Sequence, residues 1–227
     1  MIQWFPQNIS TYGGDVDHVF TLIYYIVGVW FIAAEGLLLY FVLRYRRRPG
    51  ERAAYVRGET FSQLAWVLIP AAVVLALDLS IDGVSGPVWA RIKEHQPDGG
   101  IEIHALARQF NWDFTYPGKD GKFGTPDDFE VGNELHVPVN QNVHMELRSK
   151  DVIHSFFIPT ARLKQDILPG RMIKAWFNAT VPGKYELPCA ELCGFGHYTM
   201  RGWLVVQTPD EYQAWLAEQS AKAAAAS

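Results

Sequence analysis

The sequence predicts a membrane-anchored all-β protein, in which a two-helix transmembrane hairpin precedes an antiparallel β-sandwich or barrel. Two observations predict the hairpin: two long apolar runs lie in the first third of the chain, and an arginine-rich loop separates them. A third observation predicts the β domain. From Ile101 onward, short runs alternate between apolar and polar residues and are separated by glycine and proline.

The first apolar run, Val19 to Leu43, is about 25 residues long and can span a bilayer with some tilt. Its one charged residue is Glu35. A carboxylate inside a membrane span usually has a function, and the interpretation we favour is that Glu35 pairs with a partner subunit. The second run, Phe61 to Ile81, has roughly 20 residues, contains Pro70, and carries Asp78 near its end. Alone it is the weaker of the two predictions.

The loop between the two runs predicts the orientation. Basic loops stay on the cytoplasmic side, so both termini are expected outside, with the lipid bilayer as a partner. The arginines are Arg44, Arg46, Arg47, Arg48, Arg52 and Arg57. Residues 82–87 (Asp-Gly-Val-Ser-Gly-Pro) are predicted to form the turn out of the membrane. We therefore expect residues 1–83 to form an N-terminal segment and the hairpin, and residues 84–227 to form an extracytoplasmic domain.

The residues from Met1 to Gly14 contain no basic region of the kind that begins a secretory signal. Either a signal was removed, or the first apolar run directs export; the sequence leaves both open. The 227 residues allow one globular domain plus extra segments. The aromatic content of 14% suits a membrane interface or a packed barrel. We expect no nucleic-acid partner.

Seven strands are predicted in the second part of the chain, and Pro-Gly or Gly-Asn turns separate several of them. They are residues 101–107, 109–116, 134–139, 143–147, 172–177, 183–187 and 202–207. A short amphipathic helix is expected over 209–219, with Tyr212 and Leu216 on its apolar face and Glu211 in its first turn. The alanine-rich tail, 221–227, is expected to fray.

One stretch concentrates metal-binding side chains. Cys189-Ala-Glu-Leu-Cys193-Gly-Phe-Gly-His197-Tyr-Thr-Met200 contains both cysteines of the chain, and His154 lies upstream. Thiolate and thioether sulfur and imidazole all suit copper, and two cysteines four residues apart on a loop can both bridge a pair of ions. One histidine would then complete each ion, with Met200 and the Glu191 carbonyl as weaker axial donors. A disulfide and a tetrahedral zinc site remain as alternatives.

This motif resembles the copper A motif of cytochrome c oxidase subunit II. The resemblance extends through Asp151-Val-Ile-His154-Ser, through 163–171 and through Pro182-Gly-Lys-Tyr, and with the hairpin it covers most of the chain. It implies a cupredoxin-like Greek-key barrel and a dinuclear copper centre held by the six residues named above.

The resemblance also implies a circuit. Cytochrome c or another c-type donor would reduce the copper pair, and electrons would pass to haem in oxidase subunit I, where O2 is reduced to water with proton pumping. The Glu191 side chain would bind magnesium shared with subunit I. The expected location is a bacterial-type inner membrane or an equivalent energy-transducing membrane, with the copper domain on the periplasmic side. Alternatives are the copper A subunit of a nitric oxide reductase and a membrane-tethered copper-binding or assembly protein.

Two positions depart from the family pattern. The family usually carries Gln-Trp-x-Trp, whose first Trp receives the electron; here the run is Gln109-Phe110-Asn111-Trp112, so Phe110 and Trp112 are the candidate entry residues. Many members also carry a glutamate for proton uptake at the position of Gln63. Glu59 lies one helical turn earlier and could replace it if the helix extends that far.

The remaining candidate sites are weaker. The loop from Asp120 to Asp128 has the composition of a calcium loop without EF-hand spacing, so a hairpin tip is favoured. Four histidines, His95, His104, His136 and His144, have no ligand-like neighbours in the sequence and are expected to pack in strands or lie at the surface.

Overall fold

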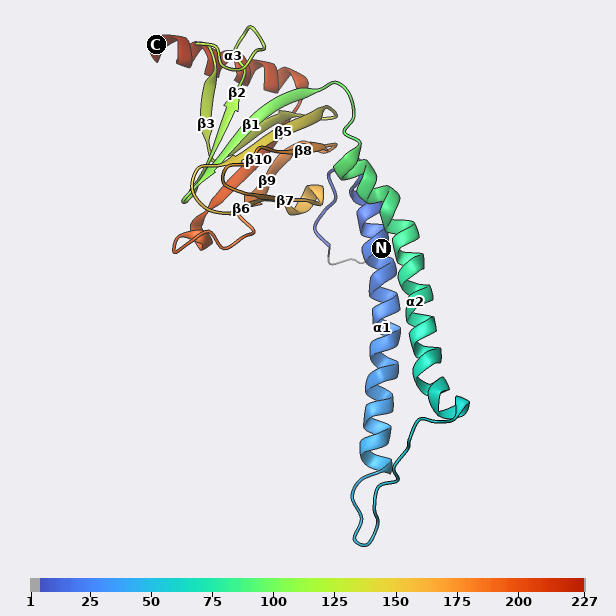
Figure 1. Cartoon of the computed structure of the whole chain (residues 1–227). Helices are drawn as coiled ribbons and strands as arrows, with labels where there is room; N and C mark the ends of the chain where they lie inside the picture. Colours follow the sequence, from blue (N-terminus) through green and yellow to red (C-terminus); the bar gives the residue numbers. More distant parts are fainter. Residues whose placement is uncertain (1–4, 227) are drawn as a thin grey trace. The chain divides into compact units, whose positions relative to one another are not determined.

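The computed structural model describes residues 5–226, which divide into two compact units (Figure 1). A helical unit spans Asp15–Trp89. A β unit contains the described residues from Ala90 onward together with residues 5–14. The boundary therefore lies after Trp89, beyond the predicted boundary at residue 83, and the N-terminal segment belongs to the β unit.

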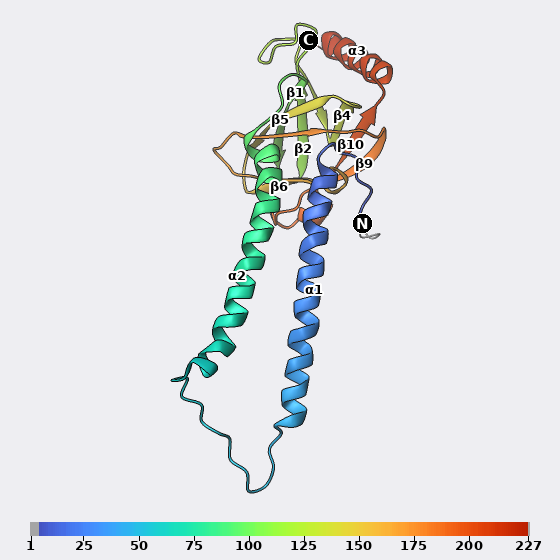
Figure 2. The ribbon, with the colours of Figure 1, turned by 90° about the vertical axis from the view of Figure 1, so that its right-hand side faces the viewer.

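The helical unit consists of α1 (Gly13–Arg44) and α2 (Phe61–Trp89), which run in opposite directions and are joined by an extended loop (Figure 2). Both helices are long and apolar enough to cross a membrane, and their most apolar stretches are not buried by other described residues. A helix satisfies its own backbone hydrogen bonds, which is what a segment in lipid requires. The predicted hairpin is thus present.

The predicted turn at residues 82–87 is wrong. These residues lie inside α2, which continues through Pro87 to Trp89 and is followed by a π-helical turn, η1 (Ala90–Glu94). Glycine and proline favour turns by local propensity. Propensity is only a weak predictor, however, and both residues are tolerated inside membrane-spanning helices. The second helix is therefore longer than its apolar run.

Residues 5–12 form a strap that packs on the β unit, and we call it the N-terminal strap. The Ile9 N–H donates to the Thr160 carbonyl (2.9 Å), and the Thr180 N–H donates to the Ile9 carbonyl (2.6 Å). The side chains of Ile9 and Tyr12 are fully buried. The strap is therefore part of the folded β unit.

This packing makes a first prediction. Ile9→Ala should lower the free energy of unfolding by about 2–5 kcal/mol, because it leaves a cavity in a fully buried position. Gln7→Ala, at an exposed position of the same strap, should change it by less than about 0.5 kcal/mol. Denaturant unfolding of the full chain in detergent, followed by tryptophan fluorescence, measures both. Equal effects of the two variants would show that the strap is not anchored as described.

The β unit contains three sheets: a five-stranded sheet in the order β3-β2-β1-β5-β8, a three-stranded sheet in the order β4-β10-β9, and the pair β6-β7. The strands are β1 (Ile101–Arg108), β2 (Asn111–Tyr116), β3 (Phe129–Gly132), β4 (Glu134–Pro138), β5 (Asn142–Ser149), β6 (His154–Ile158), β7 (Leu163–Ile167), β8 (Ile173–Asn178), β9 (Gly183–Pro188) and β10 (Arg201–Gln207).

The all-β class is confirmed, but the expectation of purely antiparallel pairing is wrong in two places. Strands β1 and β5 pair in parallel, as do β4 and β10. A parallel pair needs a long crossover, which the intervening strands provide here. Side-chain alternation predicts which face of a strand is buried and says nothing about the direction of its partner.

Three strands, β3, β6 and β7, were not predicted. Strand β3 has only four residues, and β6 is buried at four of its five positions, so neither displays a readable alternation. In β7 only the two end residues are buried. The predicted strands all have counterparts.

The core lies between the five-stranded and three-stranded sheets. Strand β2 contributes Trp112, Phe114 and Tyr116, all fully buried. The Tyr116 hydroxyl accepts a hydrogen bond from the His136 N–H (2.7 Å) and donates to the His136 carbonyl (3.0 Å), which ties β2 to β4. Paired polar groups of this kind allow a hydroxyl inside an apolar core.

The C-terminal helix α3 (Pro209–Ala226) is longer than predicted and includes most of the tail expected to fray. Alanine has the highest helix propensity, so the tail extends the helix. At the other end, the Glu211 carboxylate accepts from the N–H (2.9 Å) and hydroxyl (2.8 Å) of Thr208, a helix-capping contact. The Trp215 ring stacks on His136 at 4.2 Å between centroids and fixes the helix to β4.

Candidate metal centre

The cysteine-containing stretch forms the loop between β9 and β10 at one end of the β unit. Because β9 and β10 are antiparallel neighbours, the two ends of the loop meet, and the Cys189 N–H donates to the Met200 carbonyl (3.1 Å). The Ala190 N–H donates to the Ser155 carbonyl (3.1 Å), which joins the loop to β6. His154, the first residue of β6, is thereby brought to the loop.

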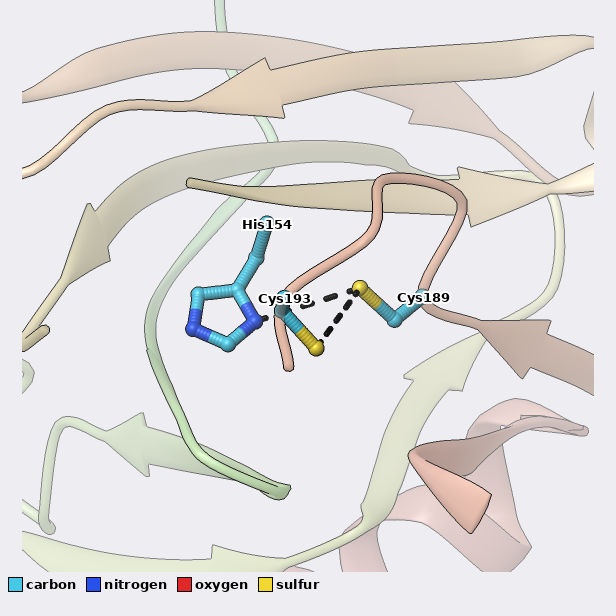
Figure 3. Close-up of side chains that lie close together, drawn as sticks. All are labelled: His154, Cys189 and Cys193. Atoms are coloured by element: carbon cyan, nitrogen blue, oxygen red, sulfur yellow. Dashed lines mark hydrogen bonds between the residues drawn. The ribbon is translucent and has the colours of Figure 1, made fainter. Parts of the chain in front are cut away.

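The predicted strong donors converge. The Cys189 and Cys193 sulfurs lie 3.9 Å apart, and the side chains of Cys189, Cys193 and His154 point toward one another (Figure 3). The His154 Nδ1 lies 3.9 Å from the Cys189 Sγ, and the His197 Nδ1 lies 3.6 Å from the Cys193 Sγ. Each histidine therefore faces a different cysteine.

Each of the two weaker donors also lies beside a different cysteine. The Met200 Sδ lies 3.8 Å from the Cys193 Sγ, and the Glu191 carbonyl oxygen lies 3.3 Å from the Cys189 Sγ. The other four predicted donor residues thus surround the sulfur atoms of the two cysteines.

These residues fit a metal better than a disulfide. Both cysteines are free, and the donor atoms of His154, Cys189 and Cys193 all lie within 4.8 Å of one another. A thiolate–metal bond is about 2.3 Å, so sulfurs 3.9 Å apart are close enough for both to contact the same ion. The thioether of Met200, buried beside Cys193, is a soft donor that suits copper.

Burial affects the protonation of the thiols. Burial, followed by the neighbouring Cys189 sulfur, raises the pKa of the Cys193 thiol to about 11. The thiolate is the form that binds metal, so an ion that enters must displace this proton. Metal loading is therefore expected to release protons at neutral pH.

Asp151 orients His154, a role that the sequence did not reveal. Its Oδ1 accepts a hydrogen bond from the His154 Nε2 (2.8 Å), which leaves Nδ1 free to face Cys189. Its other oxygen accepts from the Gln109 N–H (2.7 Å). Although burial alone would raise it, these bonds and that from the Val152 N–H hold the pKa of Asp151 below its usual range. An Asp three residues before a candidate ligand histidine was the available signal.

We therefore expect Asp151→Asn to weaken copper binding about 10–100-fold, because the neutral amide has only one acceptor oxygen and cannot accept from both the His154 ring and the Gln109 N–H. Competition with a copper chelator, followed by optical absorption, measures the change. The exposed Asp98→Asn should leave the affinity unchanged. Equal copper affinities of the Asp151 variant and the unmodified chain would show that Asp151 does not support copper binding.

The predicted electron-entry residues lie close to the donor atoms. Trp112 is fully buried, and its ring lies edge-on to His154 with centroids 6.3 Å apart. Phe110 packs against the metal-binding loop: a Cβ at Gly196 would lie 2.5 Å from its ring, so the loop approaches it only with glycine there. The Gln109 side-chain amide donates to the Cys193 carbonyl (2.7 Å), a contact that sequence reasoning missed.

Other predicted residues lie elsewhere. Glu59 precedes α2, which begins at Phe61, so the condition that it stands one turn earlier on the same helix is not met. Gln63 instead accepts hydrogen bonds from the Gly58 N–H (2.9 Å) and the Glu59 N–H (3.1 Å), both in the segment before the helix. The loop that contains Asp120 and Asp128 connects the antiparallel strands β2 and β3, as a hairpin tip does.

The expectation that His104 has no ligand-like neighbours is wrong. It lies beside Glu102 and Glu146 in a group that could hold a metal ion. Glu102 is two residues away on the same strand, but Glu146 comes from β5, and the parallel pairing that joins them was not predicted.

Comparison with known proteins agrees with this geometry. Residues 101–208 match the family model described as cytochrome c oxidase subunit II, periplasmic domain. The chain is 31% identical to the alternative cytochrome c oxidase subunit 2 of Bradyrhizobium diazoefficiens over 242 residues, covering 95% of this chain and 84% of that one. It is 31% identical to cytochrome c oxidase subunit 2 of Thermostichus vulcanus over 270 residues, covering 97% and 80%.

A solved structure adds the fold. The crystal structure of the periplasmic domain of subunit II of cytochrome oxidase from Bradyrhizobium japonicum matches with a TM-score of 0.50 at 29% identity, covering 56% of this chain and 97% of that one.

The fold and the donor set define a membrane-anchored, cupredoxin-like protein with a group of side chains that could hold a metal ion. Two apolar helices precede a β domain whose end loop gathers sulfur and imidazole donors. The chain belongs to the cytochrome c oxidase subunit II family. It is therefore a subunit of an oxidoreductase complex, in a family that binds copper.

Proposed function

We propose that this chain is the electron-entry subunit of a terminal oxidase. It would take electrons from cytochrome c and pass them to haem in subunit I, for the reduction of O2 to water with proton pumping. The observation that carries this proposal is the convergence of four further donor residues on two free cysteine sulfurs 3.9 Å apart.

In this proposal the thiolates of Cys189 and Cys193 would both hold a copper pair, His154 and His197 would each hold one ion, and Met200 and the Glu191 carbonyl would be the weaker donors. When bound, such a pair supplies a site that gains and loses one electron. The protein keeps the donors fixed: the Gln109 and Val152 N–H groups hold the Asp151 carboxylate, Asp151 holds His154, and the loop is closed at its base. Fixed ligands reduce the rearrangement that accompanies electron transfer.

Burial supports the same function. His154 is fully buried, and Cys193 and Met200 are each 2% exposed. Water is thereby kept from the sulfurs, and with its donors all supplied by protein the site has no evident open position for a substrate. A closed site of this kind suits electron transfer better than chemistry on a bound molecule.

The position of Glu191 is compatible with a second metal role. Its carbonyl oxygen faces Cys189, while the residue is exposed, so its carboxylate is free to reach a hard cation. We propose that this carboxylate binds magnesium together with subunit I.

The N-terminal strap supports an orientation with both termini outside. It is folded into the β unit, so the chain enters α1 on the side of the membrane where the β unit lies. The arginine loop between α1 and α2 would then face the cytoplasm, as basic loops do. The β unit would lie on the periplasmic side of an energy-transducing membrane.

We propose that Phe110 is the point of electron entry, because its ring lies against the metal-binding loop. Phe110→Leu should slow the second-order oxidation of reduced cytochrome c by the copper-loaded full chain about fivefold or more, as loss of an aromatic docking anchor does. Phe110→Trp should preserve or raise the rate. Stopped-flow absorbance in detergent measures both.

The matched control is Phe195→Leu, since Phe195 is 94% exposed on the same loop. A slow Phe195 variant with an unaffected Phe110 variant would move the entry point to Phe195. A copper-loaded chain that exchanges no electrons with any c-type donor would contradict the proposed function and favour a copper-binding or assembly role.

A further inference from the structure

A second group of metal-binding side chains lies on the outer face of the five-stranded sheet. The parallel register of β1 and β5 places His104 opposite Glu146 and Glu102 opposite His144. Inward neighbours such as Ile103 are buried, so these four side chains share the solvent side of the sheet. Two imidazoles and two carboxylates therefore lie on the same face, with each histidine opposite a glutamate of the neighbouring strand.

Three of these side chains converge. The His104 Nε2 lies 3.2 Å from a Glu102 oxygen and 3.9 Å from a Glu146 oxygen, and the three ligand atoms all lie within 4.8 Å of one another. The side chains of His104 and Glu146 are 30% and 15% exposed. Two of the three are thus mostly enclosed by the protein.

Neighbouring residues hold the group in place. The Phe123 ring stacks on the His104 ring with centroids 3.6 Å apart and planes at 12°. The Arg148 guanidinium donates to one oxygen of Glu146 (2.6 Å), and the other oxygen faces His104. A carboxylate that is held at one oxygen and offers the other is typical of an oriented metal ligand.

There is also space beside the group. A hollow of about 210 Å³ adjoins the two carboxylates and is lined by Gln96, Glu102, His144, Met145, Glu146 and Lys174. This volume accommodates an ion with several water molecules, each of which occupies about 30 Å³ in the liquid.

We propose that Glu102, His104 and Glu146 form a second metal site, which takes a divalent first-row transition ion such as zinc. One imidazole and two carboxylates suit zinc, with water from the hollow as the remaining ligand. The group lies apart from the sulfur centre: five residues of extended chain, about 16 Å, separate His104 from Gln109, which contacts the metal-binding loop.

The test is zinc binding to the full chain in detergent, after copper has filled the cysteine site. Equilibrium dialysis against zinc should give one additional zinc ion per chain. His104→Ala should weaken this binding at least about tenfold, since loss of a ligand costs no less than loss of its supporting contact. Glu146→Gln should weaken it similarly, and the copper content of both variants should be unchanged.

The matched control is His95→Ala, at an exposed histidine outside the group. It should bind zinc as the unmodified chain does. Equal zinc affinity of the His104 variant and the His95 variant, or no additional zinc in the unmodified chain, would overturn the proposal. Copper loading is measured separately, so failure of the cysteine site and failure of this site give different results.

Discussion

Cys193→Ser should convert the copper pair into a single ion or an empty site and abolish oxidation of cytochrome c through this chain. The Cys193 sulfur lies 3.9 Å from the Cys189 sulfur, 3.6 Å from the His197 Nδ1 and 3.8 Å from the Met200 Sδ, so one substitution removes the atom that these donors share. A serine hydroxyl is a hard, weakly acidic ligand and cannot replace a bridging thiolate for copper. Metal analysis per chain and electron paramagnetic resonance measure the loss.

The matched control is Leu192→Ser, next to Cys193 on the same loop and 77% exposed. It should retain the copper content and the spectrum of the unmodified chain. A Cys193→Ser variant that still holds a copper pair would show that Cys193 is not a bridge.

Trp112→Ala should lower the free energy of unfolding by about 3–5 kcal/mol, because it removes the largest fully buried side chain of the core. The ring contacts His154 and Phe156 edge-on, at 6.3 and 5.8 Å between centroids. The cavity would therefore open directly beneath a proposed copper ligand, and copper retention should fall with stability. Thermal unfolding of the full chain, with and without copper, measures both effects.

Trp112→Phe is the control, since it keeps a ring against His154 and should cost clearly less stability. If this variant keeps its copper and its rate of cytochrome c oxidation, Trp112 supports the site through packing. If it keeps its copper but loses the rate, Trp112 belongs to the electron path. A Trp112→Ala variant as stable as the unmodified chain would contradict the described core.

The grouping of the candidate donor residues could be predicted because most of them lie close together in the sequence. Cys189, Cys193, His197 and Met200 fall within one loop, and the chemistry of their side chains points to copper before any fold is known. Asp151 and Gln109 were missed as supporting residues. Their contacts to His154 and Cys193 depend on how three separate segments meet, and no periodicity encodes that.

For the fold too, local patterns could be predicted from the sequence and contacts between distant segments could not. Long apolar runs and alternating strands gave the hairpin and the β class, since both patterns reflect which side chains are buried. Parallel pairing of β1 with β5 and the folding of the N-terminal strap into the β unit are contacts between distant segments. The same parallel pairing brings Glu146 of β5 beside His104, which explains why His104 looked ordinary in the sequence.

The most direct test of the account is electron paramagnetic resonance of the copper-loaded full chain in detergent. The account predicts a mixed-valence signal in which one unpaired electron is shared between two equivalent copper ions. The signal should be absent from Cys193→Ser and retained in Leu192→Ser. A spectrum of a single isolated copper, or a chain that takes up zinc stoichiometrically and no copper, would contradict it.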